Sequence, residues 1–106
     1  FRLAFAKSFK MQPDVYAVAG YDSGLLLAAG MKAVGGDMSR KKELIAAMEK
    51  TRIDSPRGAW TLSKAHNPVQ DIYLRKVTGN QNRLVEIAVK ALDDDPDQMK
   101  LCKLGG

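Results

Sequence analysis

The fold is decided by the stretch PDVYAVAGYDSGLLLAAGMKAV, residues 13–34. Proline can begin a helix but cannot continue one, so Pro13 marks the start of a new element. Residues 15–34 are apolar on nearly all sides, and Lys32 is their only positive charge. A helix of this kind is buried between neighbouring elements. Each glycine within it costs roughly 1 kcal/mol of helix stability relative to alanine, which close packing or a break must offset.

The segment before this stretch also predicts a helix. Phe1, Phe5 and Phe9 recur at i, i+4 and i+8, which places them in one stripe along a helix. Pro13 ends that helix, because proline interrupts the hydrogen-bond ladder. The chain begins at Phe1 within what resembles the middle of a helix. We therefore expect the N-terminus to be cut or processed.

A further helix is predicted to begin near residue 40. Gly35 and Gly36 are typical of the end of the preceding helix. Asp37 and Ser39 are both candidates for the N-cap of the next one, because their side chains can accept a hydrogen bond from the first turn. The helix then shows an apolar face opposite a charged face and stops near Thr51.

The apolar period changes from 3.6 to 2 after a turn at residues 55–58, Ser-Pro-Arg-Gly. Short strands are predicted at 59–63, 72–77 and 84–89, and residues 79–82 form the hairpin connection between the last two. The chain is therefore α/β, with helices first and a β hairpin afterwards. A two-stranded hairpin is marginally stable alone, and so apolar a helix needs partners. The sequence thus predicts a part that packs on something larger.

Composition and charge are those of a globular protein. The chain has 106 residues, of which 45% are hydrophobic and 27% charged, and a net charge of +5. The basic residues are dispersed, and the one dense run, Arg40 to Lys42, suits the solvated first turn of a helix better than a phosphate-binding patch. A single cysteine, Cys102, excludes an internal disulfide and a cysteine-rich metal site, but leaves open a pairing with a cysteine elsewhere.

Catalytic and metal-binding patterns are missing from the sequence. His66 is the only histidine and lies in a turn-like stretch without a nucleophile motif near it, so we expect it to brace a loop. The aspartates at 93–95 and 97 lack the alternation and the terminal glutamate of a calcium loop, and are predicted to form a solvated turn. We therefore expect no catalytic residue, no metal ligand and no cofactor.

Two stretches of the sequence resemble a known family. Residues 13–22, followed by Leu25-Leu26-Leu27, resemble the P-x-x-Y-A-x-x-G-Y-D helix of type I periplasmic binding proteins, the Leu/Ile/Val-binding or extracellular ligand-binding receptor family of ABC importers. Residues 55–58, 66–71 and 73–75 are similar to the segment that follows in the same family. The resemblance covers nearly the whole chain, in the right order.

The resemblance implies a protein of two α/β lobes joined by three hinge crossings, of which this chain would supply the C-terminal part. Residues 1–54 would be helices of the N-terminal lobe, 55–63 the third hinge region, and 64–106 strands and tail of the C-terminal lobe. The hairpin would return to that second lobe. The over-apolar helix and the orphan hairpin would then each pack on a sheet supplied by the remainder of the same polypeptide.

The family pattern also implies a ligand-binding role for Tyr16, Tyr21 and Asp22, which would line or brace the interlobe cleft. An aromatic face can cover an apolar ligand body, while a hydroxyl or carboxylate fixes a polar end. The alternative for each residue is that it braces the start of the helix.

By this resemblance the protein would be the periplasmic solute-binding subunit of an ABC importer, not an enzyme. Its solute would be a small amino acid, an amide or an aromatic acid, and its partner the importer's membrane permease. Two alternatives stay open: a small basic nucleic-acid-binding domain, and a ligand-sensing regulator with the same fold.

Overall fold

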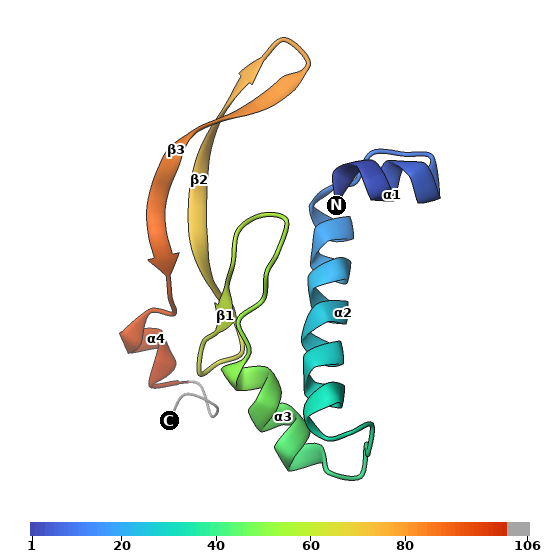
Figure 1. Ribbon diagram of the computed structural model, residues 1–106. Helices are drawn as coiled ribbons and strands as arrows, with labels where there is room; N and C mark the ends of the chain where they lie inside the picture. Colours follow the sequence, from blue (N-terminus) through green and yellow to red (C-terminus); the bar gives the residue numbers. More distant parts are fainter. Residues whose placement is uncertain (102–106) are drawn as a thin grey trace. The chain divides into compact units, whose positions relative to one another are not determined.

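The computed structural model describes residues 1–101, and the chain divides into two compact units, Phe1–Ala59 and Trp60–Gly106. The first unit holds helices α1 (Arg2–Phe9), α2 (Val15–Ala33) and α3 (Lys41–Lys50) (Figure 1). The second holds strands β1 (Thr61–Leu62), β2 (Pro68–Thr78) and β3 (Gln81–Leu92) and the short helix α4 (Pro96–Met99). Cys102, whose pairing the sequence left open, lies outside the described residues.

Helix α1 confirms the predicted phenylalanine stripe. The ring centroids of Phe1 and Phe5 lie 5.7 Å apart, and those of Phe5 and Phe9 lie 4.6 Å apart. Both distances are within the range of attractive ring pairs. The helix ends where Lys10 takes a left-handed conformation (φ 57°) and its N–H donates to the Ala6 carbonyl.

Helix α2 runs without a break through all its glycines. Asp14 caps its N-terminus, because the carboxylate accepts a hydrogen bond of 2.8 Å from the Ala17 N–H. Close packing offsets the helix cost of Gly30, which is buried and where an added Cβ would lie 2.7 Å from Met48 Cγ. The absence of a side chain at Gly30 therefore lets α3 approach α2 closely.

Helix α2 ends in the glycine motif that the sequence predicted. Gly35 and Gly36 both have positive φ, 61° and 81°. The Gly36 N–H donates to the Met31 carbonyl at 2.9 Å, and the Gly35 N–H donates to the Lys32 carbonyl at 3.2 Å. These bonds satisfy carbonyls that a helix end otherwise leaves without partners.

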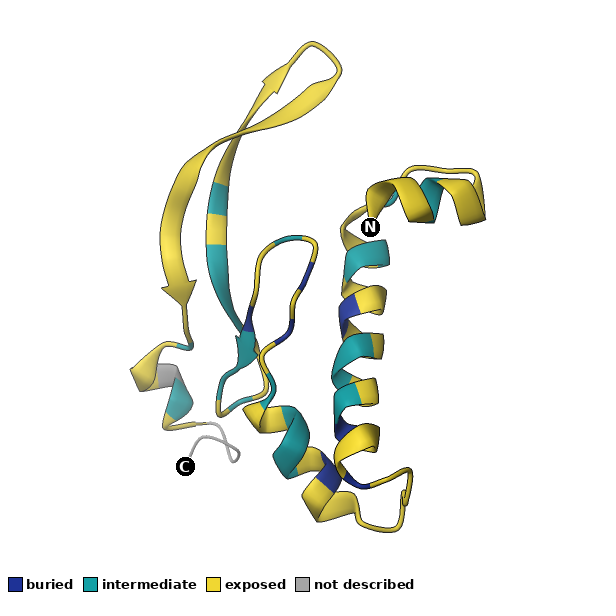
Figure 2. Ribbon diagram, in the orientation of Figure 1, coloured by how far each residue is buried: buried dark blue, intermediate teal, exposed yellow. Residues whose placement is uncertain are grey.

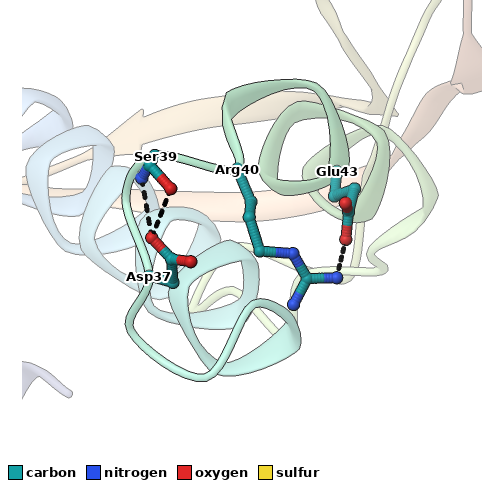
Figure 3. A network of polar contacts seen from close by, with 4 residues as sticks. All are labelled: Asp37, Ser39, Arg40 and Glu43. Atoms are coloured by element: carbon teal, nitrogen blue, oxygen red, sulfur yellow. Dashed lines mark hydrogen bonds and ion pairs between the residues drawn. The ribbon is translucent and has the colours of Figure 1, made fainter.

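The predicted N-cap of α3 was wrong, because the capping position is held by Arg40 and no side chain caps the helix there. The Asp37 carboxylate instead accepts hydrogen bonds from the Ser39 N–H (3.0 Å) and hydroxyl (2.6 Å), as Figure 3 shows. These bonds close a turn inside the connection and leave neither side chain for the helix. In the first turn of α3, Glu43 forms an ion pair with Arg40.

Much of α2 is uncovered in the described part of the chain (Figure 2). Its buried residues are Asp22 and Gly30, whereas large side chains elsewhere along it are exposed. Those exposed side chains are Val15, Tyr16, Tyr21, Leu27 and Met31. A helix with so many exposed apolar side chains is stable only when another surface covers them. The observation agrees with the expectation that this chain is a part of something larger.

The second unit is an antiparallel sheet in the order β1-β2-β3. Its hairpin is longer and its turn tighter than predicted, because Thr78 already pairs with Gln81 and leaves Gly79 and Asn80 as the turn. Gly79 has the positive φ (60°) that such a two-residue turn requires. Strand β1 is shorter than the predicted 59–63 and pairs through Thr61 and Leu62.

The acidic segment after β3 was predicted as a turn, and the structure adds the short helix α4 to it. The Asp95 carboxylate accepts a hydrogen bond of 2.8 Å from the Asp97 N–H at the start of this helix. None of the helices within residues 1–101 combines the length and the apolar character needed to cross a bilayer.

Replacing Gly30 with alanine tests the contact between α2 and α3. We expect Gly30→Ala to lower the free energy of unfolding by about 1 kcal/mol, because overpacking against Met48 outweighs the better helix propensity of alanine. Chemical denaturation of the complete protein measures the change. In a Met48→Ala background the same substitution should be neutral or stabilising. An equal loss in both backgrounds would show that the contact is not the cause.

Candidate functional site

The predicted ligand-binding residues all lie on α2 but face different directions. Successive residues of an α-helix are rotated by about 100° around its axis. Tyr16 and Tyr21 are therefore separated by about 140°, and Asp22 lies about 100° from Tyr21 and about 120° from Tyr16. The helix does not bring the three side chains together on one face. A single small ligand approaching from one side could contact only part of the set.

The two tyrosines differ in their surroundings. Tyr16 lies in the first turn of α2 and is 81% exposed. Tyr21 is 46% exposed, and its ring centroid lies 4.9 Å from that of Phe1, with the planes tilted by 51°. Tyr21 thus extends the phenylalanine stripe of α1, whereas the Tyr16 ring and hydroxyl are exposed.

Asp22 is buried, with only 1% of its surface exposed. Its Oδ2 accepts a hydrogen bond of 2.8 Å from the Ser55 hydroxyl, and the Arg57 Nε lies 3.3 Å from the same oxygen. Ser55 is also buried. The Asp22 carboxylate therefore connects α2 to the turn at residues 55–58.

That turn is ordered by its own hydrogen bonds. The Gly58 N–H donates to the Ser55 carbonyl at 3.0 Å, and the Arg57 N–H donates to the Ser55 hydroxyl oxygen at 3.2 Å. Gly58 has a φ of 107°, a conformation that favours glycine. The sequence predicted the turn but not its link to Asp22. The signal that could have found it is the carboxylate itself, since an aspartate in so apolar a helix needs a cationic partner.

Comparison with known proteins identifies the family of the chain. The family model described as periplasmic binding protein matches residues 1–82. The chain belongs to the periplasmic binding protein family. The match confirms the resemblance to the type I, Leu/Ile/Val-binding proteins that the sequence motifs indicated. A comparison with curated proteins found no match.

A solved structure shows how much of such a protein the chain represents. It is the crystal structure of an ABC transporter solute-binding protein from R. palustris in complex with benzoate, and it shares 48% sequence identity with this chain at a TM-score of 0.83. The match covers 89% of this chain but 26% of that one, so the chain spans about a quarter of the relative's length. The predicted fold class, a part of an α/β periplasmic-binding-protein fold, is confirmed.

Other polar groups of this family member have local roles. His66 lies in the turn between β1 and β2, where it has a positive φ (65°) and donates its backbone N–H to the Ser63 carbonyl at 3.0 Å. Within residues 1–101, no three His, Cys, Asp or Glu side chains gather in a way that could hold a metal ion. The basic run at residues 40–42 is exposed at the start of α3, as predicted.

Asp94 connects the end of the hairpin to the β1–β2 turn. Asn67 Nδ2 donates a hydrogen bond of 2.8 Å to Asp94 Oδ1. Hydrogen bonds from the side chains of Ser63 and Asn67 lower the pKa of Asp94, because they stabilise its charged form. In the first unit, hydrogen bonds from Ser39 lower the pKa of Asp37 for the same reason.

The Asp94 contact predicts a defined pH dependence. A carboxyl group whose pKa is lowered by folding stabilises the folded state above its unfolded pKa, about 3.9 for aspartate, and loses that effect as the pH falls through the folded value. Asp94→Asn should therefore lower the melting temperature of the complete protein at neutral pH, and the difference from wild type should shrink below about pH 4. Asp97→Asn removes a charge from the same segment and is the control. A difference that does not vary with pH would contradict this assignment.

Proposed function

We propose that the chain forms part of the solute-binding subunit of an ABC importer, which captures a small aromatic acid in the periplasm. The observation that carries this proposal is the 48% identity, over 89% of the chain, with a solute-binding protein whose structure contains benzoate. Sequence identity of this level, over most of the chain, supports a function related to that of the solved protein. The amino acids and amides that the sequence also allowed are the alternative solutes.

The division of the chain supports the proposed two-lobed arrangement. Contacts separate a first unit that ends at Ala59 from a second that begins at Trp60. This boundary falls inside the segment 55–63 that the sequence analysis assigned to a hinge crossing. We therefore propose that residues 1–54 belong to the N-terminal lobe and 64–106 to the C-terminal lobe, with the remaining sheets supplied by the rest of the polypeptide.

Tyr16 is the proposed solute contact on this chain, and Tyr21, about 140° away around α2, is the alternative contact. Both are at least 46% exposed, and each combines an apolar ring with a hydroxyl donor. An aromatic acid needs both properties, because its ring prefers an aromatic or apolar surface and its carboxylate prefers hydrogen-bond donors. Asp22 fits this task poorly, since its carboxylate is buried and would repel an anionic solute. Its geometry favours the bracing role instead.

The importer's permease and an exported location follow from the same proposal. The chain belongs to the periplasmic binding protein family, and the relative of known structure is the solute-binding protein of an ABC transporter. A ligand-sensing regulator with the same fold would bind solute without supporting its uptake. Deleting the gene should therefore lower solute uptake by the cells if the protein serves an importer, and leave uptake unchanged if it is a regulator. The nucleic-acid alternative rested on net charge alone, and neither comparison supports it.

Solute binding by the complete protein tests the proposal. Calorimetric titration should show benzoate or a close aromatic acid binding more tightly than leucine, and bound solute should raise the melting temperature by mass action. Tyr16→Ala should weaken the binding of the aromatic acid by about tenfold, as expected from the loss of a ring contact and a hydrogen bond. Tyr73→Phe, on β2, is the control. If neither aromatic acids nor amino acids bind or shift the melting temperature, the proposed function is wrong.

A further inference from the structure

The buried charge of Asp22 requires an explanation that solute binding does not supply. Asp22 has 1% of its surface exposed, on a helix whose other residues are mostly apolar. Aspartate is almost never fully buried unless a partner compensates for its lost hydration. The Arg57 side chain is 34% exposed, so solvent partly screens its attraction to Asp22, and stability alone is a weak reason for this pair. Its location suggests another role.

The contacts of Asp22 converge on the turn at residues 55–58, which follows α3 in the chain. The Ser55 hydroxyl donates to Asp22 Oδ2 at 2.8 Å and accepts from the Arg57 N–H at 3.2 Å. The Arg57 guanidinium adds its charge 3.3 Å from the same carboxylate oxygen. One side chain of α2 thereby contacts the side chains of Ser55 and Arg57, and Ser55 in turn binds the turn's backbone at the Arg57 N–H.

This turn is the last part of the first unit before the chain passes to the second. Only Gly58 and Ala59 separate Arg57 from the boundary at Trp60. Gly58, with a φ of 107°, lies in a conformation open mainly to glycine, so the backbone changes direction directly after the anchored residue. The anchoring of Ser55 and Arg57 therefore fixes the position and direction in which the chain leaves the first unit.

We propose that Asp22 is a positioning residue for lobe closure, which anchors the crossing segment through Ser55 and Arg57 and does not contact the solute. The proposal rests on the proposed function. Hinges are short segments whose backbone dihedral angles change when two domains close. If the ends of such a segment are fixed to their domains, these angles alone determine the direction of closure. The Asp22 anchor holds one end of the segment 55–63 on the first unit.

A positioning residue and a solute contact have different signatures. Loosening the anchor makes the closed form less populated, and a solute that needs this form then binds more weakly by the same factor whatever its structure. Loss of a direct contact would instead alter the ranking of solutes, because each solute uses that contact differently. The ratio of affinities for two solutes therefore separates the two roles.

The test compares Asp22→Asn, Arg57→Gln and the double variant in the complete protein. We expect each single variant to bind benzoate and a second accepted aromatic acid about fivefold more weakly, with the ratio of the two affinities unchanged. The double variant should bind each solute no more weakly than the single variant of lower affinity, because both substitutions remove the same ion pair. Fluorescence energy transfer between dyes on the two lobes should show a smaller closed fraction at equal solute saturation.

Control variants keep the outcome decisive. Asp97→Asn removes an exposed ion pair, in which Asp97 Oδ1 lies 2.7 Å from Lys100 Nζ. It should change neither the affinity for solute nor the closed fraction. If Asp22→Asn fails to fold, Ser55→Ala removes only one hydrogen bond of the anchor and should give a smaller, equally uniform loss of about twofold.

The possible failures can be told apart. Unchanged affinity and unchanged closure in the folded variants would overturn the positioning role, and so would a changed ratio between solutes, which would make Asp22 a solute contact. If the wild-type protein binds no aromatic acid and no amino acid, the proposed function fails first and the positioning role fails with it.

Discussion

The first unit depends on one buried carboxylate. Asp22 connects the longest helix to the turn that ends the unit, and it does so through Ser55 and Arg57 rather than through apolar packing alone. A directional polar contact of this kind specifies one geometry, whereas apolar surfaces tolerate sliding. The positions of Val34, Leu44 and Ile53, the buried apolar side chains of this unit, are compatible with that single arrangement.

Helix α2 is stabilised in two distinct ways along its length. Towards its C-terminal end, Gly30 allows α3 to approach, and the paired glycines after Val34 terminate the helix. Towards its N-terminal end, the Asp14 carboxylate caps the first turn, but the side chains of Val15 and Tyr16 are exposed. The C-terminal half of α2 thus packs against α3 within the described residues, although Leu27 and Met31 stay exposed there too.

The sequence predicted the elements whose cause is local. The proline at 13, the apolar period of α2 and the alternation in the hairpin each act within a few residues, and the corresponding elements are present. It misplaced the N-cap of α3, because Asp37 and Ser39 hydrogen-bond to each other instead of capping the helix. The sequence pattern does not indicate which of these two hydrogen-bonding arrangements is more stable. It predicted Tyr16, Tyr21 and Asp22 as a set, and missed the partners of Asp22. Periodicity carries no information about a contact across 33 residues.

Strand β3 has a consequence for the chain on its own. It is the last strand of the sheet, so one side of its backbone has no neighbouring strand within the sheet, and its residues are exposed along its whole length (Figure 2). Val85, Ile87 and Val89 are exposed large apolar side chains of this strand. Such an edge is a template for pairing with another copy. Separated from the lobe that we propose covers it, the hairpin would favour self-association, so correct assembly would also protect this protein from aggregation.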